Sequence, residues 1–145
     1  MIDGPLFVDS GGWVALFNVR DRDHERAAAF WREVRKRRRA LLTTDYVLDE
    51  TYTLIRRTRA GLPGAVEFHR LVTGSRLIEI AEIDARRRER AWELFTRYDD
   101  KVLSYTHCTS FALLQERGLS EVFTFDGDFG KVGFVVRPGP GSSGA

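Results

Sequence analysis

Short apolar segments alternate along this chain with longer segments in which apolar residues recur every three or four positions. The short segments have the length of buried strands, and the longer ones have the period of amphipathic helices. We expect strands at residues 6–8, 40–43, 77–83, 121–125 and 134–136, and helices at about 13–17, 24–38, 44–60, 65–72, 84–97 and 104–118. Because neighbouring parallel strands need a crossover that is usually helical, this alternation predicts an α/β fold with a central, mainly parallel sheet flanked by helices.

The composition fits one domain of this kind. The chain has 145 residues, of which 43% are hydrophobic, enough for one sizeable core. We assign residues 1–137 to the domain and the Pro-, Gly- and Ser-rich residues 138–145 to a flexible tail. No apolar run approaches the ~20 residues that span a bilayer, the first residues lack the pattern of a secretion signal, and the single cysteine, Cys108, excludes an intramolecular disulfide. These features predict a cytoplasmic protein with no membrane partner.

Two of the expected strands end directly at an aspartate. Asp9 follows the first strand and Asp126 follows the strand at 121–125, with Asp128 two residues later. In open parallel sheets ligands bind beyond the carboxyl ends of the strands, so these carboxylates are candidate site residues. The alternative is that each aspartate only forms a turn or a helix N-cap, a role in which this residue is common.

Two further segments carry candidate polar residues on expected helices. Glu50 neighbours apolar residues on its helix face and can point inward, although its periodicity favours a solvated position. Asp100, Ser104 and position 107 are spaced i, i+4 and i+7, and Ser104 is a good N-cap. Position 107 is then the third residue of its helix, where a carboxylate is expected, but the sequence has His107.

Several carboxylates held close together repel one another, and a divalent cation removes this repulsion. Mg²⁺ and Mn²⁺ prefer oxygen ligands, and in enzymes they bind through a few carboxylates, water and phosphate oxygens. Such sites activate water and stabilise the charge on a phosphodiester under attack. The residues by themselves therefore indicate a metal site for phosphoryl chemistry.

The densest charge run is Arg35-Lys36-Arg37-Arg38-Arg39, at the end of the second expected helix. One interpretation is a contact with the phosphate backbone of a nucleic acid beside the acidic site. The other, which the sequence favours, is a solvated helix C-terminus, where cations are favourable in any case. The formal net charge of +2 averages this run against the acidic residues and does not separate the two interpretations.

Four segments, in this order, resemble the motifs of the PIN-domain family, and in particular the VapC-type toxins. They are Phe7-Val8-Asp9-Ser10, residues 46–54 around Glu50, residues 100–111 with Ser104 and His107, and residues 122–129 around Asp126. The resemblance covers residues 5–136 and implies a three-layer sandwich fold. It also implies a Mg²⁺- or Mn²⁺-dependent endoribonuclease that forms a homodimer and is held inactive by an antitoxin. Asp9, Glu50 and Asp126 match three acidic positions of the family, which implies that they hold one or two metal ions directly or through water. Asp100 matches an auxiliary acid that would hold or orient a metal-bound water, and Ser104 and Asp128 are expected to support the site.

His107 departs from this resemblance, because the family has aspartate at the matching position. Three interpretations stay open. His107 is a working metal ligand that favours Mn²⁺ over Mg²⁺, or the site is catalytically weakened, or the histidine was introduced to make a toxic nuclease expressible.

The leading hypothesis for function is a metal-dependent endoribonuclease that acts as the toxin of a type II toxin–antitoxin system. One alternative is an impaired PIN domain that binds RNA or an antitoxin without turnover. The other is an RNA-processing nuclease outside toxin–antitoxin systems.

Overall fold

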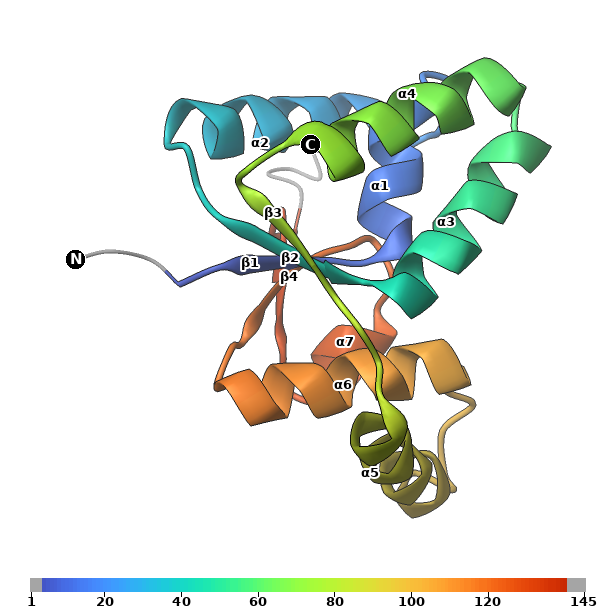
Figure 1. Cartoon of the computed structure of the whole chain (residues 1–145), viewed down its shortest axis with the longest axis vertical. Coiled ribbons are helices and arrows are strands. Elements are labelled where there is room, and N and C mark those ends of the chain that lie inside the picture. Colours follow the sequence, from blue (N-terminus) through green and yellow to red (C-terminus); the bar gives the residue numbers. More distant parts are fainter. Residues whose placement is uncertain (1–3, 141–145) are drawn as a thin grey trace.

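The computed structural model describes residues 4–140, which form five strands and seven helices (Figure 1). The strands are β1 (Leu6–Val8), β2 (Leu41–Thr44), β3 (Ile78–Ala81), β4 (Glu121–Phe123) and β5 (Val135–Arg137). The helices are α1 (Ser10–Phe17), α2 (His24–Lys36), α3 (Asp45–Arg57), α4 (Gly61–Gly74), α5 (Ala85–Arg97), α6 (Tyr105–Arg117) and α7 (Asp128–Lys131). This order confirms the predicted alternation of strands and helices.

All five strands are parallel, and they lie in the order β3-β2-β1-β4-β5. The first three strands are added in one direction, from β1 through β2 to β3. β4 then pairs with the other side of β1, so that Phe7 of β1 lies between Leu42 of β2 and Val122 of β4. The direction of strand order therefore reverses at β1, and the carboxyl ends of β1 and β4 lie side by side. Open parallel sheets bind their ligands at such a reversal point.

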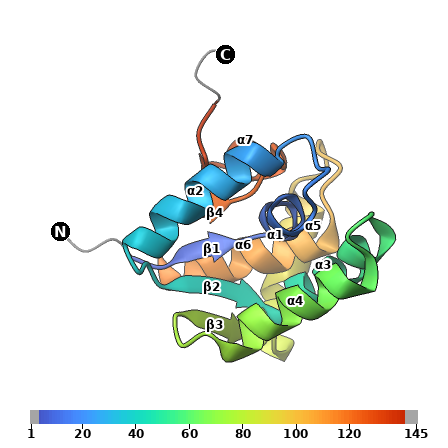
Figure 2. The same cartoon turned by 90° about the horizontal axis from the view of Figure 1, so that it is seen from above.

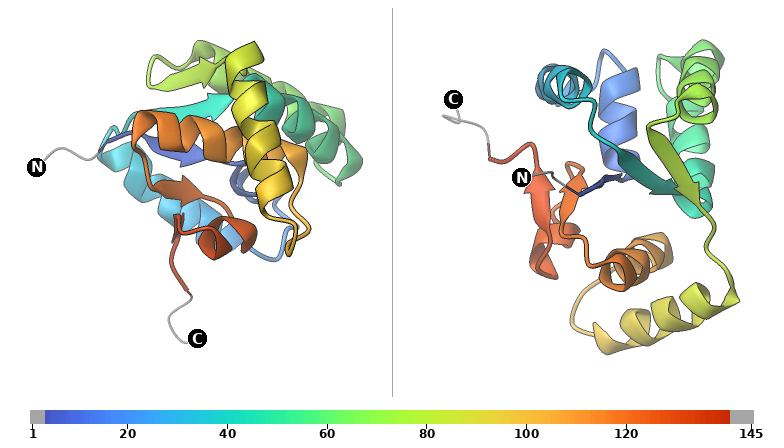
Figure 3. Two further views of the ribbon diagram at one scale, coloured as in Figure 1. Left: turned by 90° about the horizontal axis from the view of Figure 1, so that it is seen from below. Right: turned by 60° about the vertical axis from the view of Figure 1, so that its left-hand side comes forward.

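The sheet is the middle of three layers (Figures 1, 2 and 3). Helices α1–α4 cover one face and α5–α7 cover the other, which confirms the predicted sandwich. On the first face Trp13 packs against Trp31 and Phe68, with ring centroids 5.9 and 5.2 Å apart. On the second face Phe111 and Phe129 meet edge to face at 5.1 Å. Because helices bury both faces of the sheet, the central strand β1 is wholly apolar and buried.

Three helices begin where their sequences predict. Thr44, Asp84 and Ser104 are the N-caps of α3, α5 and α6, and each side-chain oxygen accepts a hydrogen bond from the backbone N–H three residues later. These bonds satisfy amide groups that the first turn of a helix leaves without a partner. The cap of α6 places His107 at the third position of the helix, as expected.

The structure corrects several element boundaries. α1 begins at Ser10, three residues earlier than predicted, and α4 begins at Gly61, four residues earlier, so the glycines of both segments lie inside helices. Gly12 is needed in α1, because a Cβ atom there would lie 2.5 Å from the carbonyl oxygen of Phe123 in β4. β4 ends at Phe123, and the short helix α7 follows it. Local propensity did not indicate these boundaries, since close packing between elements decides them.

Part of the predicted tail belongs to the described chain. The carbonyl oxygen of Gly139 accepts a hydrogen bond from Arg26, while residues 141–145 lie outside the described residues. The division between domain and tail at residue 137 stays a prediction. Across residues 4–140, every helix is too short or too polar to cross a membrane.

Candidate active site

Asp9 and Asp126 meet at the point where the strand order reverses. Asp9 directly follows β1 and is 1% exposed, and Asp126 follows β4 with its side chain 40% exposed. Thr124 links them, because its hydroxyl donates to Asp9 Oδ2 at 3.1 Å and accepts from the backbone N–H of Asp126 at 3.1 Å. The two predicted carboxylates are thus brought together, and both line an open hollow of about 510 Å³.

His107 enters this cluster from α6 and lies between three carboxylates. Its Nε2 atom is 3.4 Å from Asp126 Oδ2 and 3.7 Å from Asp9 Oδ2, and its Nδ1 atom is 3.6 Å from Asp128 Oδ2. The ring is buried and packs edge to face against Phe129, with centroids 4.9 Å apart. Ring packing and the helix cap together hold the imidazole at the centre of the acidic cluster, which we define as Asp9, Asp126 and Asp128.

The surrounding carboxylates determine the charge of His107. Burial by itself favours the neutral ring. The adjoining Asp9 carboxylate and the charges of Asp126 and Glu50 favour the imidazolium, and the net effect raises the pKa of His107 above its ordinary value. Without a cation, the surrounding carboxylates therefore stabilise the protonated form of His107. Metal binding reverses this preference, because neutral imidazole is the form that ligates metal.

Glu50 lies on α3, on the side that faces α1. It is half-buried and accepts a hydrogen bond from the hydroxyl of Ser10, the residue after Asp9. Its neighbour Asp49 is exposed. The structure therefore brings Glu50 toward the acidic cluster, although periodicity alone favoured a solvated position.

Asp100 stands apart from the acidic cluster. It lies between α5 and α6, its side chain is 69% exposed, and it forms an ion pair with Lys101 at 3.0 Å. The hydrogen bond from Lys101 lowers the pKa of Asp100. Within the described chain, the group whose ligand atoms all lie within 4.8 Å of one another is His107, Asp126 and Asp128. A role of Asp100 as an auxiliary acid stays a prediction.

The basic run at residues 35–39 lies at the amino ends of the strands, opposite the acidic cluster. Arg39 donates to the carbonyl oxygen of Gly4, just before β1, and to Glu121 at the start of β4. Asp9 and Asp126 follow the opposite ends of these strands. The interpretation that places the run beside the acidic site is wrong, because the connection from α2 to β2 brings the run to the amino ends of the strands. Its contact with RNA stays a prediction.

The donor groups around His107 fit a divalent cation, because ligand atoms of His107, Asp126 and Asp128 lie within 4.8 Å of one another. Asp9 Oδ1 is buried and accepts no hydrogen bond within the described chain, so this carboxylate has an unused ligand atom. Ligands that share one ion through bonds of about 2.1 Å lie roughly 3.0–3.4 Å apart. The distances from His107 Nε2 to Asp126 Oδ2 and Asp9 Oδ2, 3.4 and 3.7 Å, are close to this range. One imidazole among oxygen ligands suits Mn²⁺ as well as Mg²⁺.

Two residues that shape the site were not singled out from the sequence. Thr124 orients Asp9 and Asp126, and Ser10 holds Glu50. Each stands within two residues of a candidate aspartate, a spacing at which hydroxyl side chains often hydrogen-bond nearby groups. That spacing is the signal from which both could have been identified.

The strand order, together with carboxylates at its reversal point, defines the class of protein. A family model described as the PIN domain matches residues 6–135, and the chain belongs to this family. The matched range contains the acidic cluster, His107 and Glu50. The comparison confirms the family that the sequence motifs indicated.

The chain also resembles particular members of the VapC group. It is 36% identical over 134 residues to the 23S rRNA-specific endonuclease VapC20 of Mycobacterium tuberculosis, which covers 92% of this chain and 98% of the relative. The crystal structure of VapC20, described as a sarcin-ricin loop cleaving toxin, matches with a TM-score of 0.81 and 33% identity over 90% of this chain and 96% of that one. DNA-bound VapBC2 from Rickettsia felis matches with a TM-score of 0.67 over 94% of this chain and 98% of that one; at 11% identity, this likeness shows the fold alone.

Proposed function

We propose that this protein is a divalent-metal-dependent endoribonuclease and the toxin of a type II toxin–antitoxin system. The observation that carries the proposal is the convergence of Asp9, Asp126 and Asp128 on His107, in a chain 36% identical to an RNA endonuclease. Similarity to a toxin supports this hypothesis over an RNA-processing nuclease outside toxin–antitoxin systems. Asp9 directly follows β1, and Asp126 and Asp128 lie in the segment after β4, so the sheet positions these acids for one ligand.

Asp9, Glu50 and Asp126, together with His107, are the residues we propose to hold the cation, directly or through water. When bound, Mg²⁺ or Mn²⁺ lowers the pKa of a coordinated water and offsets the charge of the phosphodiester. Thr124 fixes Asp9 Oδ2 and leaves Oδ1 directed at no other group of the described chain. Asp128 faces His107 Nδ1, so a proton held on Nδ1 leaves the Nε2 lone pair on the side of Asp9 and Asp126.

The substrate we propose is ribosomal RNA, on the model of VapC20. The half-exposed Asp126 and the buried Asp9 both line the open hollow, so a phosphodiester can reach the acids from solvent. An antitoxin protein that covers this hollow would hold the enzyme inactive. The cytoplasm is the compartment in which such an RNA and such a partner occur together.

Asp9→Asn tests the ribonuclease proposal. The amide keeps the size of the side chain but removes its charge, so we expect a folded protein that no longer cleaves RNA in Mg²⁺ or Mn²⁺. Asp49→Asn removes an exposed carboxylate beside Glu50 and is the matched control, which should retain cleavage. Full cleavage by Asp9→Asn would overturn the assignment.

Calorimetric titration with Mn²⁺ and Mg²⁺ separates an enzyme from a binding module. We expect Mn²⁺ to bind the chain and Asp9→Asn to weaken that binding. If the wild-type chain binds metal and cleaves RNA as fast as the His107→Asp variant does, the interpretation of a catalytically weakened site is excluded. A chain that binds neither ion and cleaves no RNA is instead a binding module, and the enzymatic proposal fails.

We also propose that the protein forms a homodimer through α5. Trp92 and Phe95 stack with ring centroids 5.7 Å apart and are 59% and 39% exposed, and Phe95 also meets Tyr105 at 6.0 Å. Large apolar side chains that gather on one surface mark a site of protein contact. Trp92→Glu should convert a dimer into a monomer in sedimentation experiments, and a dimer that survives this change uses another face.

A further inference from the structure

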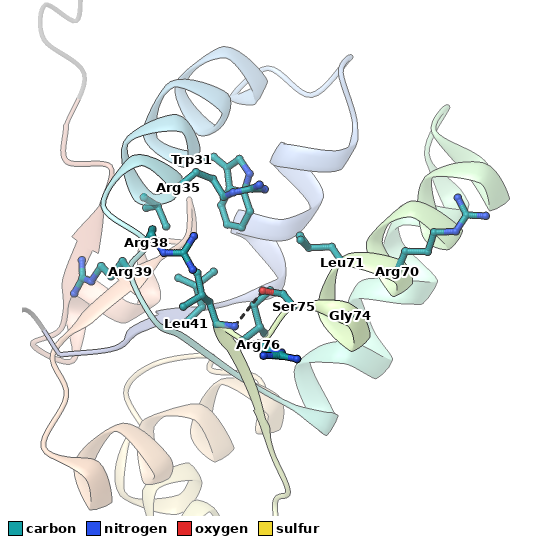
Figure 4. A pocket seen from close by; sticks show the side chains of 13 residues that line it. Trp31, Arg35, Arg38, Arg39, Leu41, Arg70, Leu71, Gly74, Ser75 and Arg76 are labelled. Carbon is teal, nitrogen blue, oxygen red and sulfur yellow. Dashed lines mark hydrogen bonds between the residues drawn. The ribbon is translucent and has the colours of Figure 1, made fainter.

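A second hollow, of about 590 Å³, lies at the amino ends of the strands. Its walls come from the end of α2, the end of α4 and the starts of β2 and β3 (Figure 4). Trp31, Leu71 and Ile78 contribute apolar surface to it. It shares no lining residue with the hollow at Asp9 and Asp126, so the two hollows are separate and lie at opposite ends of the strands.

The charges around this second hollow are all of one sign. Five arginines line it, and none of the residues lining it is acidic. Two of the five already have carboxylate partners, since Arg39 pairs with Glu121 at 2.6 Å and Arg70 pairs with Glu67 at 2.9 Å. The other three arginines that line the hollow have no carboxylate partner within the described residues.

These three groups, Arg35, Arg38 and Arg76, are called the arginine triad here. Arg35 lies over the Trp31 ring, 5.9 Å from its centroid. The side chains of Arg38 and Arg76 make neither a hydrogen bond nor an ion pair within residues 4–140. Figure 4 shows Arg35 and Arg38 on the α2 side of the hollow and Arg76 on the side of the α4–β3 turn.

Two turns far apart in the sequence bring the triad to one place. Arg38, two residues after the end of α2, has a φ of 48°, a left-handed conformation that is uncommon for a residue with a side chain. Arg76 lies in the turn before β3, where the hydroxyl of Ser75 accepts a hydrogen bond from the backbone N–H of Leu77. Like charges gathered beside an apolar wall create a positive potential that attracts anions.

We propose that the arginine triad binds phosphate groups of the RNA backbone, away from the phosphodiester that is cleaved. This inference rests on the proposed ribonuclease function. The planar guanidinium fork matches the oxygens of a phosphate in a bidentate way. The triad comes from two walls of the hollow, which suits the successive phosphates of a polyanion. A strand of four residues spans only about 13 Å, so one folded RNA can contact the hollows at both ends of the strands.

The experiment compares RNA binding by two triple variants in the Asp9→Asn background, which prevents cleavage during the measurement. The test variant carries Arg35→Gln, Arg38→Gln and Arg76→Gln. The control replaces three exposed arginines at and after the end of α3 by glutamine, namely Arg56, Arg57 and Arg59, so both variants have the same net charge. Affinity for purified 23S ribosomal RNA is measured over a series of salt concentrations, and thermal unfolding verifies that each variant is folded.

Each phosphate contact contributes about 0.7 to 0.9 to the slope of log affinity against log salt. We therefore expect the triad variant to bind RNA more weakly, with a slope shallower by about 2, while the control keeps the parent slope. Equal slopes for the two variants overturn the proposal and leave the hollow to a ligand such as an acidic protein segment.

A calorimetric titration with inorganic phosphate separates the two sources of phosphate. We expect weak or undetectable binding of the free ion, because the proposed ligand is a polyanion with several contacts. Tight binding of inorganic phosphate that the triad variant abolishes would instead define a small-anion site and overturn the RNA contact. Cleavage of the RNA by the Asp9→Asn parent contradicts the proposed ribonuclease site and is visible on a gel, independently of the salt slope.

Discussion

Replacing His107 by aspartate places a fourth carboxylate among Asp9, Asp126 and Asp128. In the metal-free protein the imidazole nitrogens lie 3.4 to 3.7 Å from these three groups, which favour the protonated ring. His107→Asp removes this ring and adds a negative charge. We therefore expect His107→Asp to lower the stability of the metal-free protein and to increase its stabilisation by Mn²⁺ and Mg²⁺.

The magnitude follows from the distances in the cluster. Two like charges 4 Å apart repel by about 1 kcal/mol in water and about 4 kcal/mol in the medium near a protein surface. The sum over three neighbours is limited, because a carboxyl group can take up a proton at pH 7 for about 4 kcal/mol. The expected loss is therefore about 1 to 4 kcal/mol. For a chain of this size that corresponds to a fall in Tm of roughly 3 to 12 °C.

The matched control for this change is His107→Asn, which has the shape of aspartate without its charge and loses the same ring packing against Phe129. Thermal unfolding of the wild-type chain and of both variants is measured with a chelator and again with saturating Mn²⁺. The Asp variant should have the lowest Tm without metal and the largest rise with it, because ligand binding to the folded state stabilises that state.

The reasoning is refuted if the Asp and Asn variants unfold at the same temperature without metal. Equal stability would mean that the carboxylates do not converge on position 107. A Tm of the Asp variant that does not respond to either ion would show that the cluster does not hold a divalent cation.

Three further predictions concern stability and reactivity. Gly12→Ala should lower the free energy of unfolding by about 1 to 3 kcal/mol in urea titrations, because its Cβ would lie 2.5 Å from the Phe123 carbonyl oxygen; Gly74→Ala, with open space around its Cβ, should be neutral or stabilising. Burial raises the pKa of Glu121, but hydrogen bonds from two arginines outweigh it and the net pKa is lowered. Its stabilisation is thus complete above the unfolded pKa and is lost as pH falls through the lower folded value, so Glu121→Gln should flatten the loss of stability below about pH 4.3 in acid titrations. Burial raises the pKa of Cys108 to about 11, so iodoacetamide at pH 8 should alkylate it slowly in the native protein and rapidly in urea; equal rates would show that the thiol is exposed.

The helix starts show what local sequence can determine. Thr44, Asp84 and Ser104 cap their helices through bonds to amides three residues away, so everything they need lies within one turn. Alternation of short apolar runs with amphipathic segments determined the fold class in the same local way. The placement of Asp9 and Asp126 after strands was also readable, because each directly follows an apolar run.

Strand order is the step that sequence reasoning could not supply. The pairing of β4 with β1, with Phe7 beside Val122, joins residues more than a hundred positions apart. That pairing brings Thr124 to Asp9, and His107 on α6 reaches the acidic cluster from the layer formed by α5–α7. The same topology places the basic run at the amino ends of the strands, away from the acidic cluster.

The sequence by itself therefore determined the class of fold and the helix caps and supplied the candidate acids, because those depend on neighbours along the chain. Only the tertiary structure decided which acids meet, since the geometry at β1 and β4 groups Asp9, Asp126 and Asp128 around His107 and leaves Asp100 with Lys101. It also decided that the arginines from two distant turns share one hollow. Their grouping depends on long-range strand pairing, and a chemical pattern read along one chain does not contain that information.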